Sequence, residues 1–125
     1  MNIEIADYNA SLALPHLPLE TVRQIQAEAK EILSELLVNP DYLDFEYSGR
    51  DADRKIVKFL CRIAPLVGTA EGEVECRLVT DMDERVLEFY SIRHGRLYKE
   101  AAKIVRMPPL EVCLDISAAE LQLSK

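Results

Sequence analysis

The side chains best suited to chemistry gather around a turn in the last third of the chain. Tyr90, Arg93, His94 and Arg96 would bring a phenol, an imidazole and two guanidinium groups close together along the sequence. Groups of these types bind anions or transfer protons where a fold makes them converge. They are therefore the candidate ligand-binding residues, and a solvated turn that carries a strand tyrosine is the alternative interpretation.

A stripe of basic side chains recurs at four-residue spacing earlier in the chain, at Arg54, Lys58 and Arg62. On a helix this spacing places all three on one face. Such a basic patch could bind an anion or nucleic acid, or it could be paired with acids of a neighbouring element. The formal net charge of −7 disfavours general binding to nucleic acid or to an anionic membrane, so we expect neither partner.

Motifs that hold metals or nucleotides are absent from the sequence. The run Asp81-Met82-Asp83-Glu84 is followed by Arg85, which stands where an EF-hand needs its third oxygen ligand. The histidines have no HxxH spacing, the cysteines have no CxxC spacing, and the glycine patterns of the Walker A and Rossmann loops are missing. We therefore expect no metal and no cofactor, assign no catalytic residue, and favour a protein that is not an enzyme.

Length and composition indicate a single cytoplasmic domain. A chain of 125 residues can bury a core of its own without disulfides. The odd number of cysteines, Cys61, Cys76 and Cys113, indicates reduced thiols. No apolar run approaches the roughly 20 residues of a membrane span, and the acidic N-terminus does not resemble a secretory signal. We therefore expect a cytoplasmic protein that does not enter a membrane.

Alternating side chains between residues 73 and 92 predict a β-hairpin. If residues 81–84 form its loop, Thr80 faces Arg85 and Cys76 faces Phe89. The opposite face of the sheet would then carry four apolar side chains among charges: Val79, Val86, Tyr90 and Ile92. A face of that kind is too apolar to be left wholly in water.

A third strand is predicted beyond the turn at residues 93–96, which has a loop of either two or three residues. Residues 97–106 fit a strand or a helix, and the short turn together with Pro108-Pro109 favours the strand. Alternation over residues 110–117 predicts a further strand, and a capping box predicts a short helix over 118–123.

Two amphipathic helices are predicted from apolar residues that recur every three or four positions. A capping box at Thr21 opens the first, and Asn39-Pro40 ends it. Asp51 caps the second, and Pro65 ends it or kinks its last turn. A short strand over residues 42–47 separates the two helices.

Residues 1–19 are predicted to form an apolar N-terminal arm, with residues 20–125 as the single domain. Pro15 and Pro18 preclude a regular helix, and the first residues could add only a short edge strand. Because a polar linker would not be rich in leucine, we expect the arm to pack onto the domain or onto a second subunit. Four leucines are the candidate interface residues: Leu12, Leu14, Leu17 and Leu19.

The second half of the pattern resembles a known group of folds. Gly49-Arg50-Asp51 opens the second predicted helix, and the run Phe89-Tyr90-Ser91-Ile92-Arg93-His94-Gly95-Arg96-Leu97 reads as strand, turn and strand. In its order of helix, strand, helix and three antiparallel strands, the chain resembles the NTF2-like (cystatin-like) cone families. That resemblance implies a sheet curled around a helix, with a pocket in which many members use an Asp or a His.

These elements together predict one α+β domain, an antiparallel sheet of four or five strands with two main helices packed on one face. The half-apolar second face and the leucine-rich arm favour a non-catalytic protein–protein interaction module of a regulatory, immunity or assembly kind. Its partner would be a second copy, giving a homodimer, or another protein. The alternatives are a small-molecule pocket protein or enzyme of the cone type, and anion or nucleic-acid binding through the basic patch.

Overall fold

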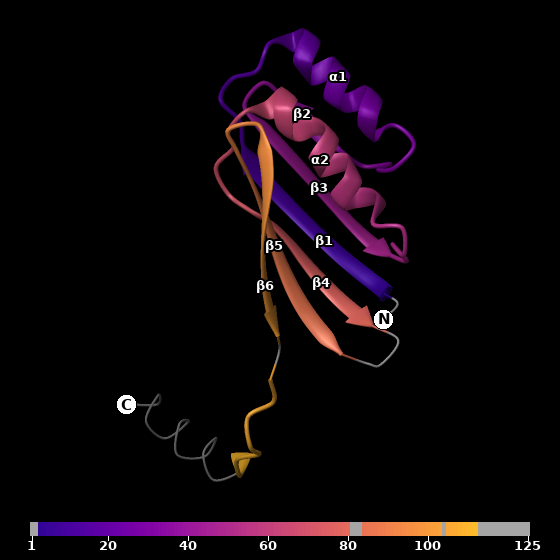
Figure 1. Ribbon diagram of the computed structural model, residues 1–125, viewed down its shortest axis with the longest axis vertical. Helices are drawn as coiled ribbons and strands as arrows, with labels where there is room; N and C mark the ends of the chain where they lie inside the picture. The colour runs from indigo at the N-terminus through magenta and orange to yellow at the C-terminus, as the bar shows by residue number, and fades with distance from the viewer. Residues whose placement is uncertain (1–2, 81–83, 104, 113–125) are drawn as a thin grey trace, which may run out of the picture.

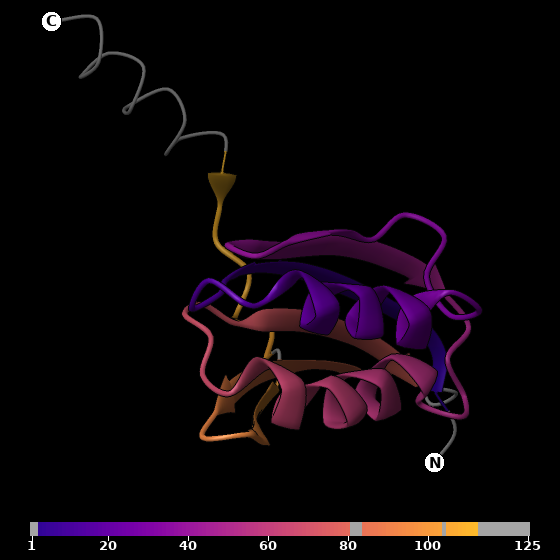
Figure 2. The ribbon, with the colours of Figure 1, turned by 90° about the horizontal axis from the view of Figure 1, so that it is seen from above.

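The computed structural model describes residues 3–80, 84–103 and 105–112. Within them, six antiparallel strands form one sheet, and two helices lie side by side on one of its faces (Figures 1 and 2). The predicted α+β class with both helices on one face is confirmed, with more strands than expected. In chain order the elements are β1 Ile3–Ala13, α1 Leu19–Ala29, β2 Leu37–Asn39, β3 Tyr42–Gly49, α2 Lys55–Val67, β4 Val74–Thr80, β5 Arg85–Arg93 and β6 Arg96–Lys103.

The strands lie in the order β2-β3-β1-β4-β5-β6, and each pairs antiparallel with its neighbours. Through β4 this is the split β-α-β arrangement of ferredoxin-like domains, and the β5–β6 hairpin widens the sheet on one side. A strand precedes the first helix, and both helices cover the same face. The chain therefore departs from the cone order of helix, strand, helix and three strands.

The first strand corrects the prediction of an N-terminal arm. β1 lies at the centre of the sheet, paired with β3 on one side and β4 on the other. Leu12, Leu14 and Leu17 are buried in the protein's own core, whereas Leu19 is 64% exposed at the start of α1. The strand escaped notice because its inward positions hold few large aliphatic residues; they include Ala6, Tyr8 and Ala10.

The core lies between the sheet and the two helices. α1 covers it with Val22, Ile25 and Ala29, and then ends well before the predicted stop at Asn39-Pro40. The residues that continue the helical spacing instead turn back, and β2 pairs with β3. The predicted helix is therefore too long, because the backbone of residues 37–39 bonds to a neighbouring strand instead of to its own preceding turn.

The second helix begins and ends close to the predicted positions. Arg54 and not Asp51 occupies the N-cap position, but the Asp51 carboxylate accepts a hydrogen bond from the Lys55 backbone N–H at 2.7 Å and so satisfies one donor of the first turn. Pro65 lies inside the last turn, and α2 continues to Val67. The helix buries six side chains, namely Ile56, Phe59, Leu60, Ile63, Ala64 and Val67.

The β4–β5 hairpin is one residue out of the predicted register. Cys76 lies opposite Glu88, not Phe89. The Thr80 N–H donates to the Glu84 carbonyl at 3.0 Å, so Glu84 belongs to the pairing and not to the loop. Because side chains alternate along a strand, this shift exchanges the two faces of β5. Three residues expected on the second face therefore turn toward the helices: Val86, Tyr90 and Ile92.

The third strand forms as favoured, after a two-residue turn. His94 and Gly95 have φ values of 53° and 73°, the positive pair typical of a type I′ hairpin. Beyond β6, residues 105–112 leave the sheet and are exposed (Figure 1). The predicted strand over 110–117 is therefore wrong for residues 110–112. Its remainder and the predicted helix over 118–123 lie outside the described residues.

Two glycines beyond α2 provide a matched test of backbone packing. Gly72 has a φ of 97°, and a Cβ there would lie 2.8 Å from the Ser11 carbonyl oxygen of β1, whereas a Cβ on Gly68, with a φ of 80°, meets no atom within 4 Å. Positive φ costs about 1 kcal/mol at either site. We expect Gly72→Ala to destabilise by about 2–3 kcal/mol in thermal unfolding, because the β1 backbone must also shift, and Gly68→Ala by about 1 kcal/mol. Equal losses of stability in the two variants would mean that the β1 backbone at Ser11 can shift away from the new Cβ at no cost in free energy.

Candidate functional site

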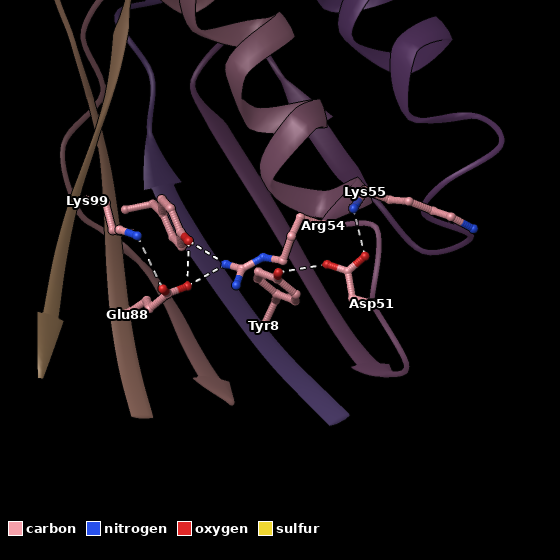
Figure 3. Close-up of polar contacts among 7 residues, drawn as sticks. Tyr8, Asp51, Arg54, Lys55, Glu88 and Lys99 are labelled. Carbon is pink, nitrogen blue, oxygen red and sulfur yellow. Dashed lines mark hydrogen bonds and ion pairs between the residues drawn. The ribbon is translucent and has the colours of Figure 1, made fainter. Parts of the chain in front are cut away.

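A buried polar network joins α2 to the sheet at the point where the helix begins (Figure 3). Arg54 Nη2 donates to Glu88 Oε1 at 2.5 Å and to the Tyr90 hydroxyl at 2.6 Å. The Tyr90 hydroxyl donates in turn to Glu88 Oε1 at 2.6 Å. Lys99 Nζ lies 3.5 Å from the other oxygen of the same carboxylate. The Glu88 carboxylate on β5 thus forms ion pairs with Arg54 at the start of α2 and with Lys99 on β6.

A second pair of contacts continues the network toward β1. The Tyr8 hydroxyl donates to Asp51 Oδ2 at 2.7 Å, and the other oxygen of Asp51 accepts the hydrogen bond from the Lys55 backbone N–H. Asp51 is only 2% exposed, so both of its oxygens are satisfied from within the protein. Arg54 has a φ of 55°, and this left-handed conformation at the helix start accompanies the turn of its side chain beneath α2 (Figure 3).

The environment of the network fixes its protonation states. Burial, followed by the hydrogen bond to Glu88, raises the pKa of Tyr90, and burial with the Asp51 contact raises that of Tyr8. Burial opposes the ionisation of Glu88. The hydrogen bonds from Tyr90 and Arg54 and the charges of Arg54 and Lys99 outweigh it, so the Glu88 pKa lies below its ordinary value. These groups are held as donors and acceptors instead of being poised to exchange protons near neutral pH.

A shallow cavity of about 420 Å³ opens beside the network, lined by Arg54, Val57, Tyr90, Leu97 and Lys99. Arg54 Nε is buried and has no hydrogen-bond partner among the described residues. Two cations, Arg54 and Lys99, therefore line an opening together with apolar side chains, and both cations contact the Glu88 carboxylate. The arrangement could hold a small anion, but the carboxylate neutralises part of the attraction.

The predicted ligand-binding cluster does not form. Tyr90 is 2% exposed and points beneath α2. Arg93 lies on the other side of the sheet, with its guanidinium 4.5 Å from the centre of the Tyr98 ring. Arg96 pairs opposite Arg93 along the backbone, and His94 is exposed in the turn. Tyr90 therefore faces the helices, Arg93 and its cross-strand neighbour Arg96 face the other side of the sheet, and His94 lies in the turn, so the four side chains do not form one site.

The predicted basic patch is also divided. Arg54 enters the buried network, and Arg62 forms an ion pair with Glu28 of α1 at 2.8 Å. Lys58 alone is exposed without an ion pair among the described residues. The alternative interpretation, in which acids of neighbouring elements pair with the basic residues, holds for Arg54, which pairs with Glu88 of β5, and for Arg62, which pairs with Glu28 of α1.

Sequence reasoning missed Tyr8, Asp51 as a partner of Tyr8, and Glu88. An acidic residue within a predicted strand indicates an exposed position. No residue near Glu88 in the sequence indicates that Arg54 contacts it. Only the buried position of Tyr90 among charged neighbours could have hinted at an internal network.

The second face of the sheet, turned away from the helices, has an apolar half. We call Ile5, Val79, Leu87 and Phe89 the apolar patch. Ile5 lies opposite Val79, and Leu87 and Phe89 follow on β5. Ile5 is 46% exposed and the others are half-buried. No described helix covers this face (Figure 2). The expected half-apolar face therefore exists, but of the four residues named for it only Val79 lies there.

The other half of the same face is an acidic groove over β1 and β3. Two adjoining hollows of about 510 and 610 Å³ share Asn9, Glu35 and Glu46. The groove contains five carboxylates, those of Asp7, Glu35, Asp44, Glu46 and Glu75. Arg77 is the basic residue of the groove lining, and its Nε lies 3.2 Å from Glu75. Glu35, Asp44 and Glu46 have no ion pair within the part of the chain that the structure describes.

Among the described residues, no three His, Cys, Asp or Glu side chains are placed to share a metal ion, and neither helix is long and apolar enough to cross a membrane. Burial raises the pKa of the Cys76 thiol to about 12, so this cysteine is an inert core residue. No family model matches the chain, and no curated protein or solved structure matches it either.

Proposed function

We propose that this protein is a non-catalytic protein–protein interaction module that uses its open sheet face to bind protein. The observation that carries this proposal is the apolar patch, which lies on a face that no described element covers. Apolar surface of this kind gains free energy when a partner removes it from water. The buried network also supports the non-catalytic part of the proposal, because its polar groups are bonded to one another and stabilise the fold.

The proposed setting is the cytoplasm. Cys61 and Cys76 are both free thiols, and Cys61 is exposed. An exposed thiol on an interaction protein suits a reducing compartment. The net charge of −7 would also limit nonspecific association with nucleic acids in that setting.

A photoreactive phenylalanine analogue at position 89 tests the proposal, with the same analogue at exposed Lys58 on α2 as the matched control. We expect illumination in host lysate to give a protein adduct, or a crosslinked dimer, at position 89 and little or none at position 58. Light scattering after size exclusion then separates self-association from binding of another protein. A monomer without adducts specific to position 89 would contradict the proposal.

In that case a second candidate function replaces it, the binding of a small anion in the cavity beside Arg54. The observation that favours this candidate is the buried Arg54 Nε without a partner among the described residues. An acceptor atom in the cavity would satisfy that donor.

A further inference from the structure

The segment after β6 leaves apolar side chains in solvent. Val105, Met107 and Leu110 are 75%, 81% and 79% exposed. We call residues 105–112 the C-terminal extension. It runs away from the sheet instead of folding back over it (Figure 1), and Pro108-Pro109 favour an extended backbone. An extended apolar segment of this kind is suited to lie in a groove on another molecule.

The same chain presents a surface that complements the C-terminal extension in charge. The match lies at the start of the extension, where Lys103 at the end of β6 and Arg106 are basic; the one acid, Glu111, is at the far end. In the acidic groove, Glu35, Asp44 and Glu46 have no ion pair among the described residues. Bringing these opposite charges together would steer and orient association.

The acidic groove also complements the extension in hydrophobic surface. Leu37 is 63% exposed and lies opposite Asp44, where it forms an apolar wall of the groove. Met107 and Leu110 of an incoming extension would cover this leucine and lose their own exposure to water.

The direction of the extension favours a second copy over the chain's own sheet. The nine residues after Lys103 can span roughly 30 Å when extended. A six-stranded sheet is about 25 Å wide, so the segment can cross a neighbouring sheet completely. To reach its own groove it would have to reverse direction immediately after β6, against the course that it takes (Figure 1).

Direct pairing of two β6 edges brings like charges together in the registers centred on residues 99, 100 and 101. In a symmetric antiparallel pair, residues on the same face must lie opposite one another. Pairing about position 99 or 100 opposes Lys99 with Lys99 or Glu100 with Glu100, and pairing about position 101 opposes Lys99 with Lys103. Like charges of this kind protect an edge strand from such contacts.

We propose that two copies of this chain exchange their C-terminal extensions, each extension lying in the acidic groove of the other copy. This inference rests on the proposed function, since it names the partner of the open face. Exchange through a twofold axis would place each extension in the groove of the other copy, so the assembly would close as a dimer with no extension or groove left unoccupied.

Charge exchange in the full chain tests the proposal, with sedimentation equilibrium as the measurement. Asp44→Lys/Glu46→Lys reverses the groove, and Lys103→Glu/Arg106→Glu reverses the segment. We expect either pair to weaken the dimer about tenfold or more, and all four together to restore most of the affinity because opposite charges again meet. The matched controls, Glu20→Lys/Glu31→Lys and Lys30→Glu/Lys58→Glu, reverse exposed helix-side residues and should weaken it less than about threefold. Circular dichroism checks that each variant folds.

Competition supplies an independent measurement without mutation. A synthetic peptide with the sequence of residues 103–112 should convert the dimer to monomer, and a peptide of the same composition in scrambled order should not. A full chain that is monomeric at all concentrations, or reversals that act no more strongly than their controls, would overturn the exchange. If the position-89 probe still captures another protein, the interaction function stands and only the exchange falls; without such adducts, both fall.

Discussion

Leu12→Lys is expected to unfold the protein, although sequence position suggests a dispensable arm. Leu12 is 2% exposed, and its strand is paired on both sides by β3 and β4. A lysine there would place an unpaired charge in the core, which costs more than about 4 kcal/mol, a large part of the stability of a typical domain. Far-UV circular dichroism should show loss of the native spectrum at 25 °C or a much lower midpoint of thermal unfolding.

The matched control is its neighbour on the same strand. Ser11 faces the open side of the sheet opposite Asp44, so Ser11→Lys should change stability by less than about 0.5 kcal/mol. Similar melting curves for the two variants would show that the alternation of β1, and with it its central position, is wrong.

Arg54→Met is expected to destabilise the fold by about 3 kcal/mol. The substitution leaves the Glu88 carboxylate buried, with the more distant Lys99 as its remaining charged partner. Removing one member of a buried ion pair costs about 3–5 kcal/mol, and the lower end applies because the Arg54 side chain is 26% exposed. Urea titration of the variant measures the loss. Lys99→Met, which removes the longer and more exposed contact, should cost only about 0.5 kcal/mol.

The double variant Arg54→Met/Glu88→Gln separates the cost of leaving the Glu88 carboxylate buried without its main partner from the cost of losing the other contacts of Arg54. If most of the cost comes from the stranded carboxylate, neutralising it should return about half of the lost stability. A double variant that is as unstable as the sum of the single variants would show that the two residues do not interact.

The pH dependence of stability gives the same network a signature of its own. The Glu88 pKa is lower in the folded protein than its ordinary value. Its stabilising contribution is therefore fully present above the unfolded pKa of about 4.3 and disappears as pH falls through the folded value. The stability difference between the native protein and Glu88→Gln should be largest above about pH 5 and shrink in more acidic solution.

The elements with strong periodic signals could be predicted from the sequence. α2 carries a clean apolar face that begins after Asp51, and β3 alternates, so both were found near their true bounds. The sequence does not predict β1, since its buried positions alternate small alanines with Tyr8 and Leu12 and therefore lack a continuous run of large aliphatic residues. The end of α1 was missed because the helical spacing continues into residues that bond to β3 instead. In both cases a distant strand decided the local structure.

The candidate site was less predictable, for a related reason. The predicted register followed from assigning residues 81–84 to the loop, which placed Glu88 on the second face of the sheet; the Thr80 N–H in fact donates to the Glu84 carbonyl. The true register buries Glu88 because Arg54, Tyr90 and Lys99 compensate its charge. A pattern of apolar and polar letters cannot represent that compensation, since its parts come from three separate elements. The assumed loop was one residue too long at its end, and the resulting one-residue shift moved every β5 side chain to the other face.

The central place of β1 has a consequence for how the chain acquires its structure during synthesis. β1 is synthesised before its partners at residues 42–49 and 74–80, so the middle of the sheet cannot close until both of those strands have left the ribosome. Contacts this distant along the chain slow folding. Until residues 42–49 have emerged, both edges of β1 present unpaired backbone groups, which exposes this strand to premature association.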